Sequence, residues 1–236
     1  MFKFFRRIRQ NVLAEGKTTK YFKYAIGEVM LVVIGILIAL QINNWNEDKK
    51  IQAQTLEYIE SIKADIINDT LAIDSLIAIG QKHIKHIEDF KTFFRQKNNP
   101  VNVLLDSSNN LPIGLYNYFP NNQTFTDMQS SGNSSLLSQQ QRNALIELSN
   151  TQQRLTIAND EITDNILLQF NDRNNLIVEN PEFYTNLNIT PSEDILTQAF
   201  IHQYNFIDLF STLANVTNRN GKVIKERSRK ALELLE

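Results

Sequence analysis

The chain has 236 residues, of which 42% are hydrophobic and 21% charged, and this balance excludes an intrinsically disordered protein. It has no cysteine, which excludes disulfides, thiolate nucleophiles and cysteine-ligated metals. Seven glycines and five prolines are few for an all-β fold, so long helices are favoured. The net charge of −2 gives no overall attraction to nucleic acid, and we predict no nucleic-acid partner.

The first 23 residues form a basic segment, with seven lysines and arginines against one acid, Glu15. Short flanks rich in these residues stay in the cytoplasm, so we predict that residues 1–23 are cytoplasmic. Phenylalanines interleave with the charges, which fits a short amphipathic piece on anionic lipid or a plain cluster that sets topology. The topology prediction rests on Arg6, Arg7, Arg9, Lys17, Lys20 and Lys23.

Residues 24–45 contain the longest apolar run of the chain. The run is too long for a signal peptide, and no pair of small residues for cleavage follows it. A soluble amphipathic helix would leave a polar stripe, and Val29 to Leu40 has none. As a helix the segment is about 31 Å long, which matches a hydrocarbon core of about 30 Å. We therefore predict a single transmembrane helix with Tyr24 and Trp45 as its interface anchors.

One face of this predicted span carries small residues and lies beside a carboxylate. Gly27, Leu31, Gly35 and Ala39 recur every four residues, and small residues at this spacing allow close helix approach. Glu28 lies next to this stripe, where it either reaches back to the interface or makes a polar contact with another transmembrane helix. We predict these five residues as a transmembrane helix contact, with a second copy or another membrane protein as partner.

Two blocks of the sequence resemble a known family. The first is KFFRRIRQ followed by YAIGEVMLVVIGILIALQINNWNE, and a looser one is TFTDMQSSGNSSLLSQQQRNALIEL at residues 124–148. They resemble a family of uncharacterised single-span membrane proteins of Bacteroidetes-type bacteria. The resemblance implies the inner membrane of a Gram-negative cell, and it supplies no catalytic residues to transfer.

Residues 46–97 follow a helical pattern, since isoleucines recur at three- and four-residue steps with charged residues between them. We call this set the seam. Thr70 and Gly80 occupy two positions of the seam without a large apolar side chain, which would loosen a regular coiled coil. The seam consists of Ile59, Ile62, Ile66, Ile73, Ile77, Ile84, Ile87 and Phe94.

Residues 98–137 are predicted to be an irregular connection, because Asn98-Asn99-Pro100 ends the helix and further Pro and Gly residues follow. Its aromatic cluster forms either a small core under the loop or a ligand site. The segment 101–105 (VNVLL) is the best strand candidate, and residues 126–131 fit one helical turn closed by Gly132. The aromatic cluster consists of Leu115, Tyr116, Tyr118 and Phe119.

Two more helices are predicted, over residues 138–174 and 191–235. Ser138 with Gln141 fits a capping box at the start of the first. Thr190 as N-cap before Pro191 fits the start of the second, which has a possible break at Asn220-Gly221. We therefore predict an all-α fold, in which a transmembrane helix continues into an elongated antiparallel bundle of about three long helices that forms an exported domain, residues 46–236.

Catalytic signatures are lacking, since no nucleotide-binding, nucleophile-elbow or zinc-protease motif occurs. His83 and His86 share a helix face and are weak metal candidates, with His202 as a distant third ligand. Lys82 and Lys85 flank them and would repel a cation, so a solvated polar face is favoured. We predict no enzyme, no cofactor and no metal.

The sequence thus favours an interaction or scaffold module, held in the inner membrane with its C-terminal domain in the periplasm. Its partners would be the lipid bilayer and, through the span or the bundle, copies of itself or another membrane protein. One alternative is a sensory or ligand-binding bundle, which would need a separate partner because 23 cytoplasmic residues cannot hold a transmitter domain. The other is a membrane-tethered hydrolase, for which the aromatic loop with His202 and Tyr204 is the place to look.

Overall fold

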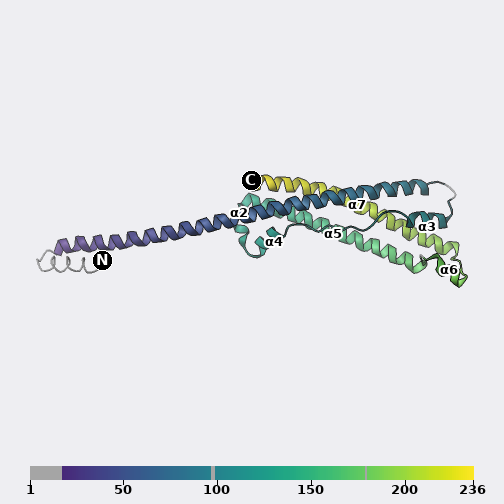
Figure 1. The fold of residues 1–236 in the computed structure, drawn as a ribbon, viewed down its shortest axis with the longest axis horizontal. Helices are drawn as coiled ribbons and strands as arrows, with labels where there is room; N and C mark the ends of the chain where they lie inside the picture. The colour runs from purple at the N-terminus through teal and green to yellow at the C-terminus, as the bar shows by residue number, and fades with distance from the viewer. Residues whose placement is uncertain (1–17, 97–98, 179) are drawn as a thin grey trace. The chain divides into compact units, whose positions relative to one another are not determined.

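The computed structural model describes residues 18–96, 99–178 and 180–236, and over these ranges its regular secondary structure is entirely helical (Figure 1). The prediction of an all-α fold with a long apolar N-terminal helix is confirmed. In chain order the elements are α2 (Thr18–Phe94), α3 (Val101–Asn109), α4 (Gln123–Ser130), the 3-10 helix η1 (Asn133–Leu136), α5 (Gln139–Leu176), α6 (Pro181–Leu187) and α7 (Glu193–Leu235).

The chain divides into two compact units, Met1–Glu57 and Tyr58–Glu236. The second, which we call the bundle unit, contains the later part of α2 and all the following helices. The packing of the bundle unit therefore begins at Tyr58. Residues 46–57, which the sequence groups with the exported domain, belong to the first unit.

Ring and hydrogen-bond contacts define how the long helices run within the bundle unit. At one end Gln141, in the first turn of α5, donates from Nε2 to the backbone oxygen of Leu234 near the end of α7 (2.9 Å), and η1 donates to Tyr58 Oη (3.0 Å). At the other end, Phe94 of α2 lies 5.1 Å from the ring of Tyr204, early in α7. Consequently α7 runs antiparallel to α2 and α5, which run parallel to each other.

Apolar side chains fill the bundle unit in two clusters that share half-buried Leu76. Two polar residues are buried as well: Asn159 of α5 is 1% exposed and Thr217 of α7 is 0% exposed. The cluster toward the Tyr58 end includes Ile62, Ile66, Ile73, Phe125, Met128, Leu145, Leu148, Leu155 and Ile224. The other includes Ile87, Phe90, Leu104, Leu105, Ile166, Phe200, Ile207, Phe210 and Leu213.

The predicted seam is used inside this chain. Ile62, Ile66, Ile73 and Ile87 are at most 3% exposed and lie in the same clusters as residues of α5 and α7. A coiled coil with another chain through the seam would need these same buried side chains. Surfaces for partners must therefore be sought on other faces.

The connection over residues 98–137 is irregular only in part, which corrects the prediction, since residues 111–122 have no regular secondary structure but helices lie on either side of them. It contains α3, α4 and η1, and the strand candidate at residues 101–105 is helical. Leu104 and Leu105 are 4–8% exposed in the cluster that α3 shares with α7, so helical packing overrides the β-preference of the valines. The turn predicted at residues 126–131 is the end of α4 with its C-cap Ser131, and Gly132 follows at φ 78°.

The structure tests three start or stop signals that the sequence suggests for α5 and α7, and two of them are wrong. The capping box is confirmed, because the Ser138 and Gln141 side chains each accept from the other's backbone N–H (3.3 and 2.9 Å). The N-cap of α7 is Ser192 and not Thr190, so the helix begins at Glu193. No break occurs at Gly221, since α7 is continuous from Glu193 to Leu235. A Cβ at Gly221 would lie 2.9 Å from Ile73 Cγ2, so the glycine allows α7 to pack closely on α2.

Candidate functional site

The apolar part of α2 is the first candidate site. Among the described residues α2 is the one helix long and apolar enough to cross a membrane, and its most apolar window has mean hydropathy 2.5. None of that window is buried. Val29, Leu31 and Leu37, for example, are 59–67% exposed. An apolar helix so bare of protein contacts requires cover from lipid or from another helix.

The residues predicted as a transmembrane helix contact lie in this exposed part. Apart from the adjacent residues and the backbone of the helix itself, nothing lies within 4 Å of a Cβ built on Gly27 or Gly35, and Leu31 and Ala39 are exposed. Glu28 is partly buried. The small-residue face is thus open along the span, and the helix contact stays a prediction.

The structure describes the side chains of only some of the predicted interface anchors and topology residues. Trp45 is 56% exposed, and Lys49 Nζ lies 4.3 Å from its ring centroid, a cation–π contact. The side chain of Tyr24 lies outside the described residues, as do those of Arg6, Arg7, Arg9, Lys17 and Lys20. Lys23 is exposed.

The second candidate site is a buried carboxylate in the bundle unit. Asp69 of α2 is 0% exposed and accepts hydrogen bonds from the loop and from α5. Tyr118 Oη lies 2.9 Å from both carboxylate oxygens, the Asn121 N–H donates to Oδ1 (3.0 Å), and Gln152 Nε2 donates to Oδ2 (2.8 Å). These four residues, which we call the Asp69 site, join α2, α5 and the loop before α4.

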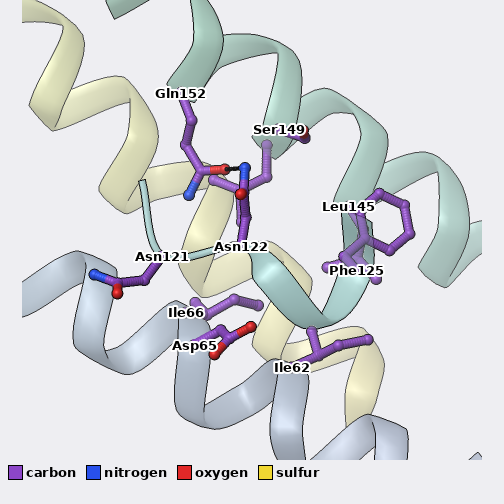
Figure 2. Close-up of a pocket in the computed structure, with 10 residues that line it drawn as sticks. Ile62, Asp65, Ile66, Asn121, Asn122, Phe125, Leu145, Ser149 and Gln152 are labelled. Atoms are coloured by element: carbon purple, nitrogen blue, oxygen red, sulfur yellow. Dashed lines mark hydrogen bonds between the residues drawn. The ribbon is translucent and has the colours of Figure 1, made fainter. Parts of the chain in front are cut away.

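One turn earlier on α2, a second carboxylate holds the start of α4. Asp65 Oδ2 accepts from the Thr124 N–H at 2.9 Å. The side chain of Asn122, the N-cap residue of α4, makes no cap hydrogen bond and instead donates to Gln152 Oε1 (3.1 Å; Figure 2). Asp65 therefore performs from α2 the capping that a local side chain usually supplies. Asp65 and Asp69 together fasten the loop and α4 to the bundle.

Burial controls the electrostatics of this site. Burial is the main cause of the raised pKa of Asp69. The hydrogen bonds from Gln152, Asn121 and Tyr118 lower this pKa, and the charge of Asp65 raises it further. Burial also raises the pKa of Tyr118, and the neighbouring Asp69 charge raises it further. Tyr118 therefore remains a neutral phenol that donates to the carboxylate.

A small cavity adjoins the site and is lined by Asp65, Asn122, Phe125, Ser149 and Gln152, among others (Figure 2). The centre of a water molecule could occupy about 10 Å³ of this cavity. That is enough for about one ordered water. Drug-sized ligands occupy sites of several hundred Å³. The Asp69 site therefore fixes the loop, and the cavity beside it does not fit an organic ligand.

The histidines proposed as weak metal ligands lie elsewhere on α2. His83 is 8% exposed and packs against the rings of Tyr116 (5.7 Å between centroids) and Phe210 (6.1 Å). Burial, and then the nearby His86, lowers the pKa of His83. His202 is elsewhere, and its Nδ1 lies 3.0 Å from Gln169 Oε1. No cluster of three or more metal-ligating side chains occurs in the described part of the chain.

The aromatic cluster of the loop divides between core and surface. Tyr116 and Tyr118 are 8% and 2% exposed, whereas Leu115 and Phe119 are 47% and 74% exposed. Tyr204, suggested with His202 as part of a hydrolase pocket, packs against Phe94 and Phe200 at ring distances of 5.1 and 6.2 Å. The buried tyrosines confirm the core interpretation for half of the cluster.

Sequence reasoning missed the Asp69 site, although the sequence held a signal for it. Asp69 lies three residues after Ile66 and four before Ile73, so it shares the helix face of these two seam residues. A carboxylate at a buried helix position needs donors from elsewhere in the fold. Tyr118 and Gln152, which supply them, are distant in sequence and carry no local mark of this role.

Over the described residues, the fold and the exposed apolar helix define an all-α protein with one candidate membrane-spanning helix. The chain belongs to a family of unknown function (DUF6090), whose model matches residues 28–211. The matched range begins at Glu28 and includes the whole Asp69 site. No curated protein and no solved structure matches the chain.

Proposed function

We propose that this chain is a membrane-anchored interaction module: α2 crosses the inner membrane, the basic N-terminus stays in the cytoplasm, and the bundle unit meets partners in the periplasm. The observation that carries the proposal is the apolar window of α2, none of which is buried. About 20 apolar residues in one helix span a bilayer, and burial in lipid removes this surface from water.

The orientation follows from charge. Residues 1–23 carry seven basic side chains and one acid, and lysines and arginines close to a span are retained in the cytoplasm. The bundle unit, on the other side of the span, then lies outside the cytoplasm. In a cell with two membranes this is the periplasm.

The bundle unit supports an interaction role over ligand sensing or catalysis. The long helices are packed on each other by two apolar clusters, and the cavity at the Asp69 site holds about one water. Apolar side chains nevertheless remain on the surface, among them Ile67, Leu71, Phe119 and Leu187, which are 50–74% exposed. Surface apolar groups of this kind mark contacts with other proteins when they are grouped.

Crosslinking in intact membranes, followed by mass spectrometry, tests the proposal. We expect a defined adduct, either a homo-oligomer or a named membrane protein, in the wild type. Glu28→Ala should weaken the adduct if the span carries part of the contact, and Glu47→Ala, which alters a carboxylate just beyond the span, is the matched control. A monomer alone in every sample would contradict the interaction role.

A further inference from the structure

We propose that Trp45 and Lys49 of α2 together bind the phosphate group of an anionic membrane lipid. We call this pair the headgroup site. It lies at the end of the apolar run of residues 24–45, before the bundle unit begins at Tyr58. The inference rests on the proposed function, because it requires α2 to cross the bilayer.

The two side chains of the headgroup site are in contact. Trp45 and Lys49 are four residues apart, so they share a face of α2, and both are exposed. Lys49 Nζ lies 4.3 Å from the centroid of the Trp45 ring, a cation–π contact that holds the ammonium group beside the indole. An ammonium group has three N–H donors, and the ring meets it from one side only. Donors therefore remain for an anion.

No carboxylate competes for Lys49 on this face. The residues three and four positions away from it on either side are uncharged, namely Trp45, Asn46, Gln52 and Ala53. The adjacent Asp48 points about 100° around the helix. Within the described part of the chain Lys49 makes no ion pair. Its charge is thus available to an external anion.

The bilayer places lipid phosphates at the level of this lysine. Ile42, Trp45 and Lys49 follow one another at steps of three and four residues, so one face changes from apolar to amphipathic to charged. An indole ring prefers the interface. Lys49 lies about 6 Å further along the helix axis, and the headgroup layer of each leaflet is about 5–8 Å thick. Its ammonium group therefore meets the headgroups.

Charge selects the class of lipid. The phosphate of a zwitterionic lipid is balanced by the cation of its own headgroup, whereas phosphatidylglycerol carries a phosphate without such a balance. A lysine near the membrane surface attracts anionic lipids for this reason. Inorganic phosphate has the same chemistry, but an anchored protein meets lipid headgroups at a much higher local concentration. The occupant we propose is therefore the lipid.

The chain has one tryptophan, Trp45, so its fluorescence reports on the headgroup site alone. The full-length protein is reconstituted in phosphatidylcholine vesicles that contain an equal fraction of either brominated phosphatidylglycerol or brominated phosphatidylcholine. Bromine quenches a tryptophan that it contacts, so the ratio of the two quenching efficiencies measures the enrichment of the anionic lipid. We expect an enrichment of about threefold at Trp45 in the wild type.

Two lysine variants separate the headgroup site from a general attraction by positive charge. Lys49→Gln should reduce the enrichment to about one. Lys50→Gln is the matched control, because it removes the same charge from an exposed neighbour that has Glu47 three residues before it, and it should keep most of the enrichment. Inorganic phosphate added at constant ionic strength should leave the wild-type value unchanged.

The outcomes distinguish this inference from the proposed anchor. Equal quenching by the two brominated lipids in the wild type would overturn the headgroup site, as would an equal loss of enrichment in both variants, and either result would leave the anchor standing. Loss of the enrichment on addition of inorganic phosphate would overturn the choice of a lipid as occupant. No quenching by either lipid would show Trp45 away from the bilayer and would overturn the anchor as well.

Discussion

Asp69 shows how one buried residue shapes the bundle unit. Its carboxylate accepts from Tyr118, Asn121 and Gln152, and these donors come from a loop and a helix far away in the sequence. Both oxygens act as acceptors. An amide in the same place can accept at one atom only, and its NH₂ group would face the Gln152 Nε2 donor.

We therefore predict that Asp69→Asn lowers the free energy of unfolding at pH 7 by about 2–4 kcal/mol, the loss expected for charged hydrogen bonds and a buried unpaired donor. Urea unfolding of the full-length protein in mild detergent, followed by circular dichroism, measures it. Asp74→Asn is the control, because Asp74 is exposed and pairs with Lys225 at the surface, where an ion pair contributes at most about 1 kcal/mol. Equal losses in both variants would contradict the role of Asp69.

The same residue predicts a pH dependence. The pKa of Asp69 in the folded protein lies above its ordinary value of 3.8, chiefly because of burial. The folded state then binds the proton more tightly than the unfolded state, so this group's contribution to stability falls as pH rises from that ordinary value through the folded pKa. Unfolding curves over acid pH should show this loss in the wild type and not in Asp69→Asn. The same slope in both would exclude Asp69 as its source.

Gly80 marks another close approach in the bundle unit. A Cβ built there would lie 2.9 Å from Tyr116 Oη and 3.1 Å from Ala214 Cβ. Gly80→Ala should therefore destabilise by about 1–3 kcal/mol, although alanine is the better helix former. Gly114→Ala, where no atom lies within 4 Å, is the control and should be neutral or slightly stabilising. Thermal unfolding compares the two, and a neutral Gly80→Ala would show that Tyr116 moves aside freely.

At the scale of elements, α5 depends on how it starts. Ser138 and Gln141 satisfy each other's backbone N–H groups, and Gln141 also donates to Leu234 at the end of α7 (2.9 Å). The start of α5 is thus linked to the C-terminus of the chain. Helix α4, in contrast, is capped from α2 by Asp65, so its position depends on tertiary structure.

Ser138→Ala should lower the free energy of unfolding by about 1 kcal/mol, the usual loss of an N-cap. Hydrogen exchange of the first amides of α5 should rise in the same variant, because their acceptor is removed. Ser75→Ala on the exposed surface of α2 is the control, with a change within about 0.5 kcal/mol. No difference between the two variants would mean that packing alone sets the start of α5.

The sequence predicts those features of the structure that neighbouring residues determine, and it misses those that depend on residues far apart in the chain. The apolar span, the seam and the capping box are local patterns, and they predict the long helices well. α3 depends on Leu104 and Leu105 packing in the bundle, and the start of α4 depends on Asp65, so neither follows from its own residues. The Asp69 site joins residues 49 and 83 positions apart, which no spacing rule reveals.

For the whole molecule, we propose that one exposed apolar helix anchors the chain, with the basic N-terminal residues on one side of the membrane and the bundle unit on the other. The cysteine-free sequence offers a direct measurement. Asn11→Cys and Ser75→Cys place a single thiol on either side of the proposed span. A membrane-impermeant maleimide, added to cells with a permeabilised outer membrane, reports which side each thiol faces. We predict that the membrane fraction holds the protein, that Ser75→Cys is labelled before the inner membrane is lysed, and that Asn11→Cys is labelled only after lysis. Protein in the soluble fraction, or labelling of Ser75→Cys only after lysis, would contradict the proposed anchor and its orientation.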